Sequence, residues 1–126
     1  MAIETRTIVF GQAELSRAAF AHCLRRGSAP ERGRLKAVRA EPAARGRVVV
    51  LFDVGEAEDL AVVLTYTEMA AALIRHCGVV GIPLPRYGRK RLEPSGEGMA
   101  LIVRLPEHAG PAMAVDAPAV IALPAR

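Results

Sequence analysis

The sequence predicts an α+β fold in which a strand–helix–strand–strand unit is duplicated. The pair His22-Cys23 recurs as His76-Cys77 in a chain that holds only two cysteines and three histidines. The surrounding residues match at one constant offset: Glu14, Ala18 and Gly27 correspond to Glu68, Ala72 and Gly81. Self-similarity at a fixed spacing indicates a repeated supersecondary unit. We therefore interpret residues 7–54 and 61–105 as two repeats that form a single domain, residues 1–105.

The match continues past this region after small changes in spacing. Pro30, Gly33 and Arg34 correspond to Pro85, Gly88 and Arg89, and Glu41-Pro42-x-x-x-Gly46 corresponds to Glu93-Pro94-x-x-x-Gly98. One helix on three strands does not close a core alone, so the two units are expected to pack against each other. The expected product is two helices on a mainly antiparallel, six-stranded arrangement with pseudo-two-fold symmetry.

Each unit is predicted to open with a short strand that leads into a helix. The runs Thr7–Phe10 and Ala61–Leu64 have the length and the apolar or β-branched content of strands. In the second unit Thr65 and Glu68 have capping-box spacing, in which each side chain bonds the other residue's backbone N–H. Glu14 holds the position of Glu68 in the first unit, so we expect it to serve the start of a helix rather than catalysis.

Two helices of similar length are expected to follow, over residues 12–26 and 66–80. Each ends at a glycine, Gly27 or Gly81, which suits the left-handed position after a helix. At the helical repeat of about 100° per residue, each cysteine lies near the centre of an apolar stripe. Each neighbouring histidine lies on the flank of that stripe.

Each helix is followed by a predicted antiparallel hairpin. Residues 34–41 are expected to pair with 47–54, and residues 89–93 with 99–105, each pair closed by a six-residue loop that contains Pro and Gly. The second strand of each hairpin is a continuous apolar run, which indicates a central strand that is covered on both faces or is covered by the other repeat. This order of elements resembles the duplicated strand–helix–strand–strand modules of gyrase-inhibitor-like ligand-binding domains. The resemblance lies in the order of elements and transfers no function.

Residues 106–126 depart from the repeat and are expected to form a Pro/Ala-rich C-terminal tail. The segment holds four of the nine prolines and one short apolar run, residues 119–123. Two interpretations stay open for it. The segment is a mobile tail, or its apolar run adds an edge strand to its own sheet or to that of a neighbour.

Composition favours a globular cytoplasmic protein. The apolar share is 52%, and aromatic residues make up 4% with no tryptophan, so the core is expected to be aliphatic. A membrane-spanning helix needs about 20 apolar residues, and every apolar stretch in this sequence is much shorter. The first residues lack the apolar segment of a secretory signal. The heavy use of arginine and alanine is typical of a GC-rich bacterial genome.

Few residues have the spacing of a catalytic or metal site. None of the three serines lies in a glycine-framed nucleophile elbow, and no phosphate-binding glycine loop is present. Zinc ligation by His22, Cys23, His76 and Cys77 is one interpretation, but adjacent helical residues point about 100° apart and do not readily face one ion. We favour buried cysteines with histidines at their edge. The sequence therefore predicts no enzyme, no metal and no cofactor.

Basic residues gather at the start of one strand in each unit. These basic rows are Arg32, Arg34 and Lys36 in the first unit and Arg86, Arg89 and Arg91, with Tyr87, in the second. In an extended strand Arg34 and Lys36 share one face, while Leu35, Ala37 and Leu92 are expected to face inward. Paired basic rows suit an anionic partner, and Tyr87 offers a stacking face for a base. A solvated outer face that discourages edge pairing explains the same charges.

The expected function is that of a small bacterial cytoplasmic binding or adaptor protein that is not an enzyme. Its contact surface is expected along the pseudo-dyad groove and the basic rows. The expected partner is another protein or a second copy, paired through a sheet edge as a homodimer, and not a membrane. One alternative is a nucleic-acid-binding protein that uses residues 32–36 and 86–91 on one continuous face. The other is a small-molecule sensor with an enclosed cleft in the groove.

Overall fold

The computed structural model describes residues 3–106 of the 126-residue chain. The expected C-terminal tail lies outside the described residues except for Pro106. No helix in the described range is long and apolar enough to cross a membrane. The elements in chain order are β1 (Ile3–Phe10), α1 (Gln12–Arg26), β2 (Arg34–Ala40), β3 (Arg47–Asp53), β4 (Leu60–Thr65), α2 (Tyr66–Val80), β5 (Arg89–Ser95) and β6 (Gly98–Pro106).

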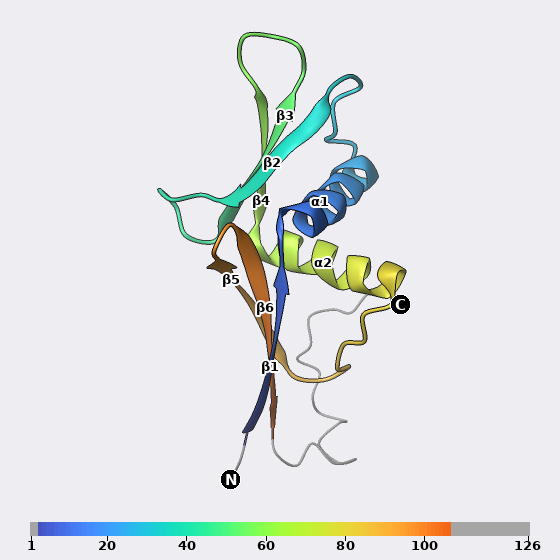
Figure 1. The fold of residues 1–126 in the computed structure, drawn as a ribbon, viewed down its shortest axis with the longest axis vertical. Helices are drawn as coiled ribbons and strands as arrows, with labels where there is room; N and C mark the ends of the chain where they lie inside the picture. Colours follow the sequence, from blue (N-terminus) through green and yellow to red (C-terminus); the bar gives the residue numbers. More distant parts are fainter. Residues whose placement is uncertain (1–2, 107–126) are drawn as a thin grey trace.

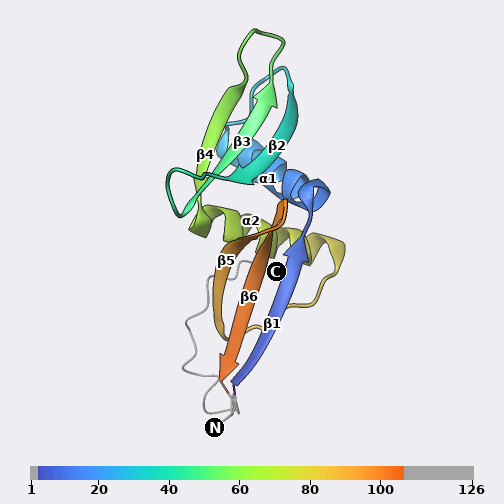
Figure 2. The same cartoon turned by 60° about the vertical axis from the view of Figure 1, so that its left-hand side comes forward.

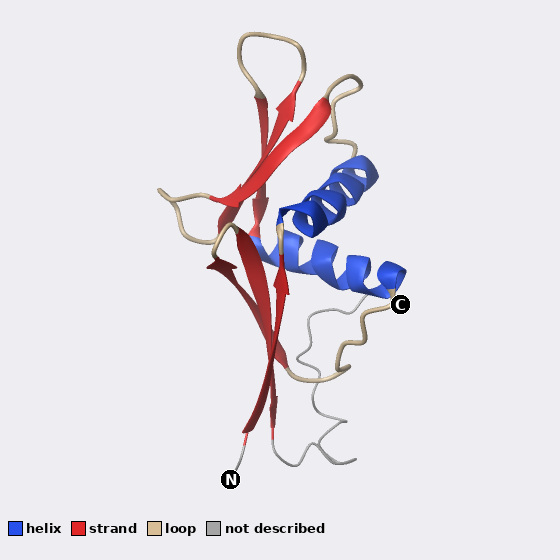
Figure 3. Cartoon of the chain, in the orientation of Figure 1, coloured by secondary structure: helices blue, strands red, loops and turns tan. Residues whose placement is uncertain are grey.

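These elements confirm the predicted α+β class and the predicted bounds of both helices. The six strands form two three-stranded antiparallel sheets, with the orders β1-β6-β5 and β2-β3-β4. The sheets follow one another along the long axis of the molecule (Figures 1 and 2). The two helices lie together at one side, beside the region where the sheets meet (Figure 3). The expected hairpins β2–β3 and β5–β6 are both present.

The opening strands pair across the molecule, which the sequence did not predict. Strand β1 pairs with β6, and strand β4 pairs with β3. Each sheet therefore combines a hairpin from one predicted unit with the first strand of the other. Strands β2 and β5 do not pair with each other within residues 3–106. The expected six-stranded arrangement is thus two separate sheets, joined by chain crossings and by the core.

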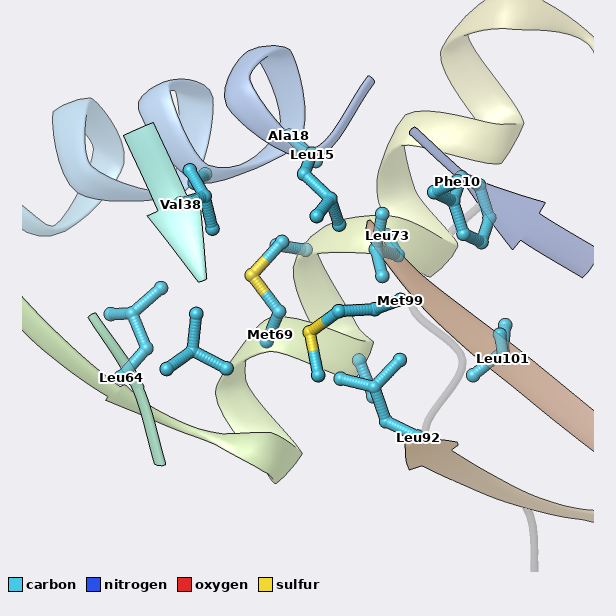
Figure 4. Packing of buried hydrophobic residues seen from close by; sticks show 14 of the residues in the cluster. Phe10, Leu15, Ala18, Val38, Leu64, Met69, Leu73, Leu92, Met99 and Leu101 are labelled. Atoms are coloured by element: carbon cyan, nitrogen blue, oxygen red, sulfur yellow. The ribbon is translucent and has the colours of Figure 1, made fainter. Parts of the chain in front are cut away.

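Every one of the eight elements contributes a buried side chain to a single core. Figure 4 shows these side chains converging from both helices and both sheets, with Met69 and Met99 beside each other near the centre of the view. Strand β3 buries only its inner face fully. In β3, Val48 and Val50 are buried, whereas Val49 and Leu51 on the outer face are half-buried. Of the two predictions for β3, cover on both faces is therefore wrong, because the helices lie on one side of each sheet.

The helix ends follow the predicted signals with one exception. Thr65 and Glu68 form the capping box, with Glu68 N donating to Thr65 Oγ1 at 3.0 Å and Thr65 N donating to Glu68 Oε1 at 2.9 Å. Gly27 and Gly81 adopt the left-handed conformation, with φ of 76° and 83°. Helix α1 begins after Gly11, which offers no side-chain cap. The exception is Glu14, whose carboxylate is directed toward α2 and lies 3.8 Å from His76 Nε2.

The second hairpin closes with a shorter turn than predicted. Ser95 pairs with Gly98, so only two residues, Gly96 and Glu97, separate β5 from β6. In the first hairpin Glu41 N donates to Arg47 O at 2.8 Å, which leaves a five-residue loop. The matched Glu-Pro pairs therefore occupy different places, a loop in the first hairpin and strand β5 in the second. Proline is tolerated in β5 because β5 is an edge strand.

Candidate functional site

The two basic rows lie at opposite ends of the molecule. Arg34 begins β2 and pairs with Asp53, beside the loop at the top of Figure 1. Arg89 begins β5 and pairs with Arg104, near the N-terminal end of the chain at the bottom of Figure 1. The nucleic-acid alternative requires both rows on one continuous face. The arrangement of the strands does not bring the rows together in this way.

Within each row the charges differ in their surroundings. Arg32, Arg34, Arg86 and Arg89 are exposed. Lys36 Nζ donates to Asp59 Oδ2 at 2.9 Å, and this hydrogen bond raises the pKa of Lys36. Arg91 bonds Glu93 through Nε at 3.1 Å and Nη2 at 3.0 Å. Tyr87 is 37% exposed. Each row therefore has one cation that is paired with a carboxylate of its own chain.

A bulge in β2 changes which side chains of the first row share a face. The register runs from Leu35 opposite Phe52 to Ala37 opposite Leu51, which leaves Lys36 as the extra residue. Leu35 packs against the core, as predicted, and so does Leu92 in β5. The prediction that Ala37 faces inward is wrong, because the bulge shifts the alternation by one residue. Val38 takes the inward position and is fully buried.

One histidine–cysteine pair lies on each helix, His22-Cys23 on α1 and His76-Cys77 on α2. Cys23 and Cys77 are free and buried, and burial raises the pKa of both thiols. His22 is half-buried, and its pKa is lowered by burial first and then by the nearby arginines, Arg26 most of all. His76 is 8% exposed. Residues 3–106 contain no group of three or more His, Cys, Asp or Glu placed to hold a metal ion. Both cysteines belong to the buried core, as the sequence predicted.

A groove of about 870 Å³ lies where the two sheets meet. The start of α1, the outer edge of β2 and the β5–β6 turn form its walls. Lys36 and Arg39 bring positive charge to it, and Glu97 is its acidic residue. Of the seven predicted contact residues, only Lys36 lines this groove. Arg39 was not predicted from the sequence. The usable signal was a charged residue two positions beyond Ala37, in the same predicted strand.

Gln12, the first residue of α1, joins the three walls of the groove. Its Nε2 donates to Val38 O at 2.5 Å and to Glu97 O at 2.8 Å, and its Oε1 accepts from Val38 N at 3.2 Å. The carboxamide thus satisfies both backbone groups that Val38 directs away from β3. Gln12 corresponds to Tyr66 in α2, so a difference between the two helix starts was the signal that could have identified it.

This groove combines an exposed strand edge, two cations and a side-chain amide, groups that can bind a ligand. None of its described lining residues pairs a nucleophile with a general base at hydrogen-bonding distance. Comparison of the chain with models of known protein families, with curated proteins and with solved structures finds no match.

Proposed function

We propose that the protein is a small bacterial cytoplasmic binding or adaptor protein, not an enzyme, and that its groove holds an extended segment of another protein. The observation that carries this proposal is the edge of β2 inside the groove, where the Gln12 carboxamide already bonds Val38 N and O. A strand edge with unpaired N–H and C=O groups is a recurrent site for an added peptide strand. The groove therefore has the backbone chemistry that such a partner needs.

The hydrogen-bond pattern of β2 supports this use of the edge. Glu41 N bonds Arg47 O, so alternate residues from Glu41 back along β2 face β3. Val38 and Ala40 consequently direct their N–H and C=O groups toward the groove. Gln12 makes with Val38 the two bonds that one residue of an added antiparallel strand makes. A bound peptide displaces this carboxamide and continues the pairing to Ala40.

Charge supports an acidic segment as the partner. Arg39 is exposed and has no ion pair within the described part of the chain, and Lys36 remains exposed beside its partner Asp59. Complementary charge raises the association rate and selects among partners more than it sets affinity. The preferred ligand is therefore an extended peptide with apolar residues on one face and carboxylates near its ends.

We also infer that residues 1–105 are one domain made of two copies of a single unit, related by a pseudo-two-fold axis. The strand registers support this inference. Phe10 pairs with Met99 as the last residue pair of β1 with β6, and Leu64 pairs with Val48 next to the end of β4 with β3. All four side chains are buried and belong to the shared core. The single core with contributions from every element supports one domain.

Two glycines give the duplication independent support. Gly33 and Gly88 each precede the first strand of a hairpin, with φ of 125° and 113°. A Cβ on Gly33 lies 2.7 Å from Asp53 O, and a Cβ on Gly88 lies 2.8 Å from Arg104 O. The same unusual backbone therefore meets the same strand neighbour in both halves. Duplication of one unit explains both glycines at once, whereas separate origins require the same backbone constraint to arise twice.

Selection of peptides on the purified protein tests the binding function. A phage-displayed library of random dodecapeptides is selected on the full chain, and the affinities of enriched peptides are measured by fluorescence anisotropy. We expect acidic peptides whose Kd rises by about tenfold when Arg39→Glu reverses a groove charge. Arg34→Glu is the matched control, since it makes the same charge change in the same strand outside the groove, and it is expected to change Kd less than about twofold. Absence of enriched peptides, or equal effects of both variants, contradicts the proposal.

A further inference from the structure

Four strands lie at sheet edges in the described part of the chain: β1, β5, β2 and β4. An unpaired edge invites pairing with another chain, and proteins commonly block it with inward-pointing charges, proline, a bulge or a cover. Three of these edges carry such a feature, and β4 does not.

Three of the edges are blocked. In β1, Glu4 and Arg6 lie opposite Leu105 and Val103, on the inner face of the sheet, where charge opposes burial by a second chain. In β5, Lys90 also lies opposite Val103, and Pro94 lacks a donor. Burial lowers the pKa of Lys90.

The β2 edge is blocked in another way. The bulge at Lys36 interrupts its register, and the Gln12 carboxamide covers the N–H and C=O of Val38. A peptide that displaces Gln12 can reach this edge, whereas a second rigid sheet cannot follow the bulged strand. Each of these three edges thus has at least one feature that prevents continuous pairing with a folded partner.

Strand β4 has none of these features. Its sequence, Leu-Ala-Val-Val-Leu-Thr over residues 60–65, contains no charge and no proline. Its register with β3 is unbroken from Arg47–Thr65 to Phe52–Leu60. Val63 is 52% exposed and Leu60 is 41% exposed. An exposed and regular edge that is apolar from Leu60 to Leu64 is a site for pairing with another chain or for aggregation.

The backbone groups that β4 offers follow from one hydrogen bond. Tyr66 N donates to Gly46 O at 2.9 Å, so Leu64, Val62 and Leu60 face β3 in alternation. Ala61 and Val63 therefore direct their N–H and C=O groups away from the sheet. Thr65 N is already bonded to Glu68 Oε1, which ends the free edge at its C-terminal side. The available edge is thus centred on Val62.

We infer that β4 pairs antiparallel with β4 of a second copy of this chain, about a two-fold axis at Val62. This pairing places Ala61 opposite Val63 and Leu60 opposite Leu64 of the second copy, so every apolar residue from 60 to 64 meets an apolar partner. An axis at Val63 instead requires Thr65 N, which Glu68 holds. A two-fold interface has to be self-complementary, and this strand is.

Charge at the two ends of β4 favours the same partner and the same direction. Glu56, Glu58 and Asp59 precede the strand, whereas Arg47 lies beside its last residue, Thr65. Antiparallel pairing brings the acidic end of each copy toward the arginine end of the other. Parallel pairing sets like charges side by side, which is unfavourable. The dimer contains one continuous sheet with the order β2-β3-β4-β4-β3-β2.

This inference deepens the proposed binding function, on which it rests only for the choice of a protein as partner. Strands β2 and β4 are opposite edges of one sheet, so the groove stays open in the dimer. Self-association and peptide binding are therefore separate measurements. A dimer that binds no peptide contradicts the groove proposal alone, and a monomer that binds peptides contradicts the β4 inference alone.

Sedimentation equilibrium of the full chain tests the dimer. We expect a mass of twice 13.4 kDa at micromolar concentrations. Val63→Lys sets a lysine close to the second copy and is expected to weaken dimerisation by at least about tenfold. Val9→Lys is the matched control, because Val9 is 61% exposed and lies next to the last residue of the blocked edge β1. A monomeric native chain at about 100 μM, or equal loss in both variants, overturns the inference.

A disulfide tests the position of the axis without weakening the interface. Two Val62 residues facing each other as a non-hydrogen-bonded pair have Cα atoms about 4.5 Å apart, near the lower limit for a disulfide. Val62→Cys is therefore expected to give a covalent dimer on mild oxidation, while Leu60→Cys is not. The native cysteines are buried and do not compete. Cross-linking through Leu60→Cys alone contradicts an axis at Val62.

Discussion

The two helices bury the same positions, counted from their first residues, and differ on their remaining faces. Leu15, Ala18, Ala19 and Cys23 are buried in α1, and Met69, Ala72, Leu73 and Cys77 are buried at the corresponding positions of α2. Helix α2 also buries Ala70, Ile74 and His76, whereas their counterparts in α1 are not buried. Helix α2 has a capping box, and α1 has no side-chain cap.

This comparison separates what the fold requires from what is free to vary. The residues at the four shared positions all belong to the buried core, where a change in volume is costly. Outside them, the start of α1 has become a wall of the groove, while the start of α2 is closed by its own side chains. The same contrast holds for the edges, since β1 is blocked by inward charges and β4 is not. The surfaces proposed for binding are thus places where the two halves differ.

The largest effects on the free energy of unfolding are expected at the matched positions Gly33 and Gly88. Gly33→Ala and Gly88→Ala each place a Cβ within 2.8 Å of a backbone oxygen, at a φ that side chains rarely adopt. We expect each to lower the free energy of unfolding by about 2–4 kcal/mol, measured by urea denaturation. Gly55→Ala is the control, because Gly55 has a positive φ but nothing within 4 Å, and is expected to cost about 1 kcal/mol. A neutral Gly33→Ala beside a costly Gly88→Ala contradicts the equivalence of the halves.

Local signals were sufficient to predict the helices and the hairpins. Thr65, Glu68, Gly27 and Gly81 act within one turn of the residues they affect, so the helix ends could be read from the sequence. The pairing of β1 with β6 could not, because residues 89 to 103 positions apart in the chain leave no local pattern. Only the turn of the second hairpin was predicted wrongly, because its Glu-Pro pair matched that of the first, while Gly96, with a positive φ of 60°, closes a shorter turn.

The candidate site was predicted less well than the fold. Lys36 was found because it is charged and repeats the position of Arg91. Gln12 was missed because its role depends on the edge of β2 and on the β5–β6 turn, both distant in the sequence. The basic rows recur in the sequence, yet the strands that carry them, β2 and β5, begin at opposite ends of the molecule. Repetition of a motif therefore does not imply that its copies share one surface.

The helix starts provide a prediction of intermediate size. Thr65→Ala removes the hydroxyl that accepts from Glu68 N and is expected to destabilise the protein by about 1 kcal/mol in thermal or urea unfolding. Gly11→Ser adds a cap to α1, where φ is −83° and a Cβ meets nothing within 4 Å. It is expected to stabilise by only a few tenths of a kcal/mol, about the known difference between Ser and Gly at this position. A loss of stability in Gly11→Ser shows that the start of α1 is not free to accept a cap.

The smallest expected effect is a pH dependence that arises on α1. Burial lowers the folded-state pKa of His22 below its unfolded value of about 6.5, and Arg26, Arg25 and Arg75 lower it further. The unfolded chain therefore binds more protons as the pH falls through about 6.5, so stability is full above that pH and declines below it. Urea unfolding at pH 7.5 and 5.5 measures the decline. His22→Gln is expected to flatten it and Arg75→Gln to reduce it. A decline that His22→Gln leaves unchanged assigns the pH dependence to groups other than His22.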